Sequence, residues 1–337
     1  MNSFIPKQFA GKISFSENED LSEKVTAAAS VISIENILNT LKNSLFESLG
    51  QALRIFGGVF AMITVSAVFG IYQKSFGNKF EICQQVCVLC LVLNLFYCMT
   101  PIIDNTQQAC QNICIVSQSL IASLCSLSVM GGEIIGSVVA DSGAMLVISI
   151  IQIVCTNFIY PLMRACLVIS CCSGLCQSLN LKGVSAFIKS VCSWGLGSMT
   201  TLFSCVLLLQ KSVTLSADGF NIKLSKFALT SIIPVVGGMV GESLRTVLGS
   251  IGVIKSTAGI LGISSIIYMV IPPLCAVLIY KLTVLACAFL SRAVGLPKQS
   301  ELLYEVNGML NILNSVIICV SLTFIIACAI LMKSVNV

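Results

Sequence analysis

Long uninterrupted apolar stretches dominate the pattern of hydrophobic and polar positions along this chain. Eight runs of 17 to 28 residues contain no Asp, Glu, Lys or Arg. These runs are 55–73, 82–103, 105–132, 142–163, 165–181, 190–210, 256–280 and 306–332, the run 165–181 continuing the one before it. The hydrocarbon core of a bilayer is about 30 Å thick and a helix rises about 1.5 Å per residue, so roughly 20 such residues cross it. The pattern therefore predicts transmembrane helices.

The runs and their boundaries predict about seven spans, within a range of six to eight. The expected spans are 54–72, 82–99, 113–130, 144–160, 184–210, 259–280 and 311–332. Pro101 is expected to stop the second span, and the polar stretch 104–112 to begin an interfacial helix. Pro161 predicts a kink or a second helix after residue 160.

The segment 226–255 departs from this pattern. Its apolar parts are too short and too rich in glycine for one clean span, so we expect a broken or re-entrant segment, with two half-helices meeting at 234–238. A turn is predicted just before it, at 216–219 (SADG). Broken helices persist in a membrane only where protein or a water-filled cavity covers the freed backbone groups.

The chain divides into three parts. Residues 1–31 form a polar N-terminal arm, residues 32–53 an amphipathic helix, and residues 54–333 a polytopic membrane domain. In the second part the apolar positions 34, 37, 38, 41, 45, 49 and 53 fall on one helical face. That helix either lies on the membrane surface or a partner, or simply leads into the first span.

Composition narrows the class of protein further. The 337 residues are 56% hydrophobic and only 10% charged, whereas a soluble domain carries about 25% charge. The apolar runs are continuous, which excludes the alternating pattern of a membrane β-barrel. The fold class is therefore an all-α, polytopic helical membrane protein. Its net charge of +5 is scattered, and no basic block indicates a nucleic-acid partner.

The residue types argue against catalysis. The chain has no His, so the usual general base and the commonest metal ligand are both missing. Its 18 Cys lie mostly in the apolar runs at helical spacing, where a small hydrophobic role is favoured over zinc or redox chemistry. No GxxxxGK[ST] motif is present, so any energy must come from another subunit or an ion gradient. We predict no enzyme activity, no cofactor and no metal.

A few polar and small residues stand out within the apolar background. Glu242 and Arg245 can pair on one helical face, either lining a cavity or lying at the membrane interface. Arg164 either has a function at depth or marks where a helix leaves the bilayer. The glycine pairs favour close helix packing over ligand binding; they are Gly132/Gly136, Gly237/Gly241 and Gly195/Gly197.

Four short motifs recur in the order and near the spacing of a known family. They are 216–219 (SADG), Lys226 and Phe227 leading to 233–237 (IPVVG), 255–262 (KSTAGILG) and 279–281 (IYK). From about residue 102 onward the chain resembles stage III sporulation protein AE, while the first 100 residues match only in hydropathy. The candidate functional residues are Lys226, Phe227, Pro234, Gly237, Gly238, Glu242, Arg245, Lys255, Gly259 and Gly262.

The resemblance implies a membrane subunit of a secretion-like channel complex that joins mother cell and forespore and supports forespore development. It implies as partners the other membrane proteins of that complex, a separate ATPase subunit and a forespore protein. It also implies a location in the mother-cell-derived membrane around the forespore. Family members typically start with a signal peptide and a longer extracytoplasmic region, and we expect that start to be missing or shortened here.

Two other functions are weighed against this one. A self-sufficient secondary transporter would need a polar cluster within a span, and only Gln152 with Asn157, and Asn311 with Asn314, suggest one. An intramembrane enzyme would need His or paired carboxylates within a span, and the spans contain neither.

Overall fold

Every element is helical in the part of the chain that the computed structural model describes, which is residues 34–76, 81–131, 134–175, 182–232 and 237–332. The elements are α2 (Ile34–Phe76), α3 (Glu81–Met130), α4 (Ile134–Val154), the π-helical segment η3 (Cys155–Ile159), α5 (Tyr160–Leu175), α6 (Lys182–Ile232), α7 (Gly237–Ala293) and α8 (Pro297–Met332). The all-α prediction is confirmed.

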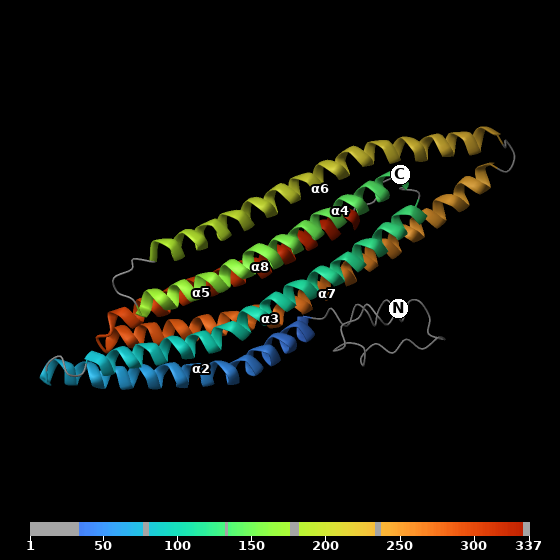
Figure 1. Ribbon diagram of the computed structural model, residues 1–337. Helices are drawn as coiled ribbons and strands as arrows, with labels where there is room; N and C mark the ends of the chain where they lie inside the picture. Colours follow the sequence, from blue (N-terminus) through green and yellow to red (C-terminus); the bar gives the residue numbers. More distant parts are fainter. Residues whose placement is uncertain (1–33, 77–80, 132–133, 176–181, 233–236, 333–337) are drawn as a thin grey trace.

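Six helical segments of the described chain are long and apolar enough to span a membrane, within the predicted range of six to eight. One of them combines α4, η3 and α5. The helices form an elongated bundle in which α8 contacts α3, α5, α6 and α7 (Figure 1). The 57 residues of α7 would extend about 85 Å at 1.5 Å per residue, well beyond the hydrocarbon thickness of one bilayer.

The predicted interruption at Pro101 is wrong. Helix α3 is a single helix of 50 residues that contains both predicted spans and the polar stretch 104–112 between them. A proline removes one backbone hydrogen bond, but packing against neighbouring helices can hold the helix together. The residues around Pro101 supply that packing, since Met99 and Ile103 are fully buried.

The predicted turn at 216–219 is also wrong, because these residues lie inside the 51-residue helix α6. Gly and Asp lower helix stability by about 1 kcal/mol or less each and do not by themselves force a turn. The helix does end at Ile232, and the next begins at Gly237, within the segment predicted to be broken. Each side continues as a helix of more than 50 residues, so two long helices, not two short half-helices, flank this point.

The long apolar segment that contains Pro161 continues as helix beyond residue 160. The backbone passes through the π-helical turn of η3 directly before Pro161 and then into α5. Wider π-helical turns are inserted in helices where the regular hydrogen-bond ladder is disturbed. A further helical element, α5, therefore follows the π-helical turn, while the predicted kink stays a prediction.

Helix α2 runs without interruption across the predicted boundary between residues 53 and 54. Its contact face in the amphipathic part is formed by small residues, Ser44, Ser48 and Ala52, each buried to 9% exposure or less. Small side chains allow the backbones of neighbouring helices to approach closely. The apolar face predicted from the sequence points outward instead, and Leu38 and Leu53 are more than half exposed.

Candidate functional site

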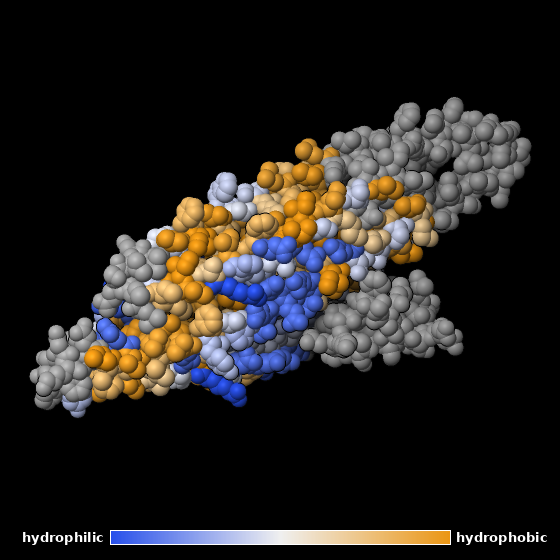
Figure 2. Space-filling model, viewed as in Figure 1, coloured by the Kyte–Doolittle hydropathy of each residue, from blue (hydrophilic) through white to orange (hydrophobic). Residues whose placement is uncertain are grey.

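Polar side chains from six helices meet near one level of the bundle, which we call the polar belt. Its contacts between helices are Tyr280 (α7) to Gln51 (α2), Arg164 (α5) to Asp104 and Gln107 (α3), and Lys189 (α6) to Glu305 (α8). On the visible face of the molecule, hydrophilic side chains gather between apolar areas on either side (Figure 2). The belt is a feature of the assembled bundle, because its residues come from distant parts of the chain.

One further hydrogen bond aligns the helices at this level. The Tyr160 hydroxyl donates to the Thr106 carbonyl oxygen at 3.0 Å, one turn from the Arg164–Asp104 pair. Thr106 also lines a recess between α2, α3 and α7, together with Gln51 and Tyr280. This hydrogen bond and the side chains of the recess bring α2, α3, α5 and α7 into register.

Lys189 and Glu305 form the most enclosed ion pair of the belt. Their side chains are 16% and 27% exposed. The Lys189 ammonium group also donates to the Glu305 carbonyl oxygen at 2.9 Å, and the Ser185 hydroxyl donates to the Glu305 carboxylate at 2.9 Å. A Cβ atom at Gly308 would lie 3.3 Å from the Lys189 nitrogen, so the glycine makes room for the lysine. The pair fastens α6 to the central helix α8.

Arg164 has a different environment. Its guanidinium donates to Asp104 at 2.7 Å and to the Gln107 amide oxygen at 2.9 Å, yet about half of each charged side chain is exposed. Ionised groups exposed to acyl chains are strongly disfavoured. Pairing with Asp104 and Gln107 satisfies part of the Arg164 guanidinium, and both predicted roles, a function at depth and a helix leaving the bilayer, stay predictions.

The structure places three of the ten sequence-predicted candidate residues with their surroundings. Lys255 is buried at 3% exposure, and Gly259 and Gly262 lie on the same side of α7. A Cβ atom at Gly259 would overlap the Met332 side chain of α8, and one at Gly262 would lie 3.2 Å from Leu120 of α3. These glycines act in helix packing.

The other candidates surround the junction of α6 and α7. Pro234 lies outside the described residues. Lys226 and Phe227 belong to the last turns of α6, and the remaining four belong to the first turns of α7. Those four are Gly237, Gly238, Glu242 and Arg245. The structure describes only the helical backbone there, so the proposed Glu242–Arg245 pair stays a prediction.

The close packing expected at Gly195 and Gly197 is absent from the structure. A Cβ atom at either position would meet no other atom within 4 Å. The glycine spacing alone did not predict which helix faces approach each other. Among the described glycines, those where a Cβ atom would lie within 3.3 Å of another side chain are in other helices, at Gly58, Gly174, Gly259, Gly262 and Gly308.

The cysteines of the described chain are free thiols, and most of them are buried. Cys110, Cys114 and Cys155 lie in one apolar cluster of the core. Among the described residues, no group of three His, Cys, Asp or Glu is arranged to hold a metal ion. The burial of most cysteines is consistent with a role as small hydrophobic side chains.

Sequence reasoning missed Lys189, Glu305 and Gln51 as belt residues. Lys189 and Glu305 each lie directly beside a charge-free run, which is the only local signal for them. Nothing in the sequence pairs them, because they are 116 residues apart.

Comparison with known proteins gives one consistent result. Residues 16–335 match the family profile described as stage III sporulation protein AE. The stage III sporulation protein AE of Bacillus subtilis (strain 168) is 22% identical over 288 residues, covering 82% of this chain and 71% of that protein. No solved structure matches the chain.

Proposed function

The chain belongs to the stage III sporulation protein AE family and has a role in sporulation, and from this premise we propose that it is a membrane subunit of a secretion-like channel complex. The complex would join mother cell and forespore and support forespore development. The chain would lie in the mother-cell-derived membrane around the forespore. The family match over residues 16–335 is the observation that carries this proposal.

Two further observations support it. The six candidate spans suit a multi-pass membrane subunit. The sequence contains no GxxxxGK[ST] loop, so ATP hydrolysis by that type of loop would fall to a separate ATPase subunit. We propose as partners that ATPase, the other membrane proteins of the complex and a forespore protein.

Deletion of the gene tests the proposal most directly. The expected result is arrest of forespore development, restored by a tagged copy that co-purifies with the ATPase and other membrane subunits. Normal spore formation in the deletion strain would contradict the proposal. Restored development without any co-purifying subunit would contradict membership of the complex while leaving the sporulation role intact.

A self-sufficient secondary transporter is the alternative, favoured by the recess at the polar belt between α2, α3 and α7. Such a transporter would move its solute when the purified chain alone is reconstituted in liposomes. The channel proposal expects no solute uptake above protein-free liposomes until the partner subunits are added.

The junction between α6 and α7 gives a second test. Replacing Gly237 and Gly238 with Leu should block sporulation, with at least a tenfold loss of spores, while leaving the protein in the membrane. The two bulky side chains would enter the first turn of α7, within the segment that the sequence predicts to be broken. The matched control is Leu at Gly249 and Gly252 of the same helix, where a Cβ atom meets nothing within 4 Å. Equal spore counts in both variants would show that the junction has no special role.

A further inference from the structure

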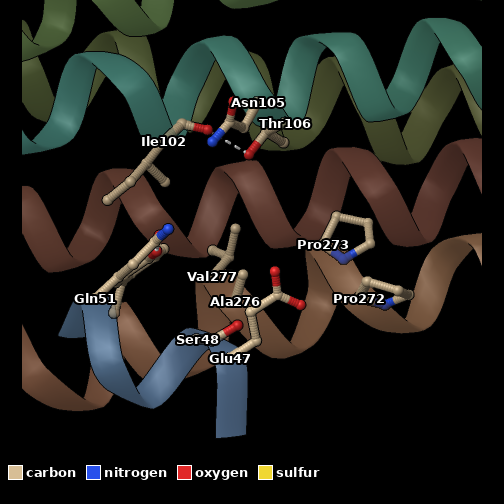
Figure 3. Close-up of a pocket in the computed structure, with 11 residues that line it drawn as sticks. Glu47, Ser48, Gln51, Ile102, Asn105, Thr106, Pro272, Pro273, Ala276 and Val277 are labelled. Atoms are coloured by element: carbon tan, nitrogen blue, oxygen red, sulfur yellow. Dashed lines mark hydrogen bonds between the residues drawn. The ribbon is translucent and has the colours of Figure 1, made fainter. Parts of the chain in front are cut away.

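A recess of about 220 Å³ opens between α2, α3 and α7 at the level of the polar belt (Figure 3). Its polar lining residues are Glu47, Ser48, Gln51, Asn105, Thr106 and Tyr280. Its apolar lining residues are Ile102, Pro272, Pro273, Ala276 and Val277. At roughly 30 Å³ per water molecule, the recess has room for a small organic group rather than for a single ion.

The charge of the recess favours a cation. Among the described residues that line the recess, Glu47 is the only carboxylate, and none is a Lys or an Arg. In Figure 3 the Glu47 carboxylate points from α2 towards Pro272 and Pro273 of α7. The ion pairs within the described chain do not include Glu47. An anion would therefore be repelled, and a cation would find a carboxylate available.

The recess contains neutral hydrogen-bond acceptors beside its carboxylate. The Thr106 hydroxyl donates to the Ile102 carbonyl oxygen at 2.7 Å, and the Tyr280 hydroxyl donates to the Gln51 amide oxygen at 2.5 Å. Both hydroxyl hydrogens are thus engaged, so a ligand would meet the lone pairs of these two hydroxyl oxygens, whereas the Gln51 and Asn105 amides each offer an acceptor oxygen and an NH2 donor group. Pro272 and Pro273 have no backbone N–H and add no donor to the α7 wall.

We propose that this recess binds a primary ammonium group. Such a group carries one positive charge and three N–H donors, which match one carboxylate and several neutral oxygen acceptors. Glu47 would neutralise the charge, while Gln51, Asn105 and Thr106 accept hydrogen bonds. The ammonium group comes either from an ethanolamine lipid headgroup or from a free amine. The site does not depend on membership of a channel complex.

The experiment uses the purified full-length chain in detergent. Thermal unfolding is followed by the fluorescence of Trp194, the single tryptophan of the chain, in ethylammonium chloride or tetramethylammonium chloride at equal ionic strength. Ethylammonium should raise the unfolding temperature, and tetramethylammonium, which has no N–H, should not. Glu47→Gln should weaken the apparent affinity for ethylammonium at least tenfold.

Two more variants guard against trivial effects. Glu301→Gln removes a carboxylate that does not line the recess and should keep the wild-type response. Asn105→Leu removes an acceptor from the α3 wall and should weaken the response even if Glu47→Gln cannot be purified. Nanodiscs containing phosphatidylethanolamine or phosphatidylcholine then distinguish the source.

A gain in stability with phosphatidylethanolamine over phosphatidylcholine supports the lipid headgroup. A gain with ethylammonium but equal stability in the two nanodiscs supports a free amine. Equal responses to the two ammonium salts, no response to either, or an unchanged response in both recess variants would overturn the proposal.

Discussion

Replacing Lys189 with Met is expected to lower the free energy of unfolding by about 1–3 kcal/mol, between the values typical of exposed and of fully buried ion pairs. The substitution removes the cation but leaves Glu305 largely enclosed between α6 and α8, with an exposed fraction of only 27%. A carboxylate without its partner in such a place keeps the desolvation cost and loses the compensating attraction. The loss should appear as a lower unfolding temperature in detergent and as less protein in the membrane.

The charge-exchanged variant Lys189→Glu with Glu305→Lys tests whether the pair itself is responsible. It should recover part of the loss, although the hydrogen bond from Lys189 to the Glu305 carbonyl depends on the original arrangement. The matched control is Arg164→Met, which removes the cation of an ion pair whose side chains are about half exposed. Exposed pairs contribute about 0–1 kcal/mol, so this variant should unfold close to wild type. Similar losses at the two sites would contradict the argument from burial.

Replacing Gly259 with Leu is expected to destabilise the bundle by at least about 1–3 kcal/mol. Gly259 is buried, and a Cβ atom there would overlap the side chain of Met332 on α8. A leucine would push α7 and α8 apart or displace Met332. The same measurements of unfolding temperature and membrane abundance apply.

The control for Gly259 lies two turns earlier on the same helix. Gly252→Leu adds the same side chain where a Cβ atom meets nothing within 4 Å, so its effect should be small. Removing the Met332 side chain with Met332→Ala should partly rescue Gly259→Ala. If Leu lowered the unfolding temperature equally at positions 252 and 259, the effect would come from replacing a glycine in the helix backbone and not from the contact with Met332.

One of the four motifs that carried the family resemblance, KSTAGILG at 255–262, thus has a physical role in helix packing. In the KSTAGILG motif, Lys255 is buried, and Gly259 and Gly262 allow α8 and α3 to approach α7. The sequence analysis named these three as candidate functional residues, and the structure places both glycines at helix contacts. The functional role proposed for the earlier motif, around Lys226 and Pro234, stays a prediction.

The sequence by itself determined that the chain lies in a membrane, that its fold is all-α and which family it resembles. Charge-free runs such as 306–332 must be helical in a membrane, because the hydrocarbon supplies no hydrogen-bond partner for an unpaired backbone. That constraint acts on each segment separately and can be read locally. The order of short motifs likewise lies in the sequence alone.

Only the tertiary structure decided which local breaks matter and which polar residues meet. Packing against neighbouring helices keeps α3 continuous through Pro101, and the residues 216–219, which each weaken a helix by only about 1 kcal/mol or less, stay inside α6. Arg164 finds Asp104 across 60 residues, and Lys189 finds Glu305 across 116. Such pairings depend on which helix faces pack together, and in a chain that is apolar on nearly every face the hydrophobic pattern does not single out the faces that touch.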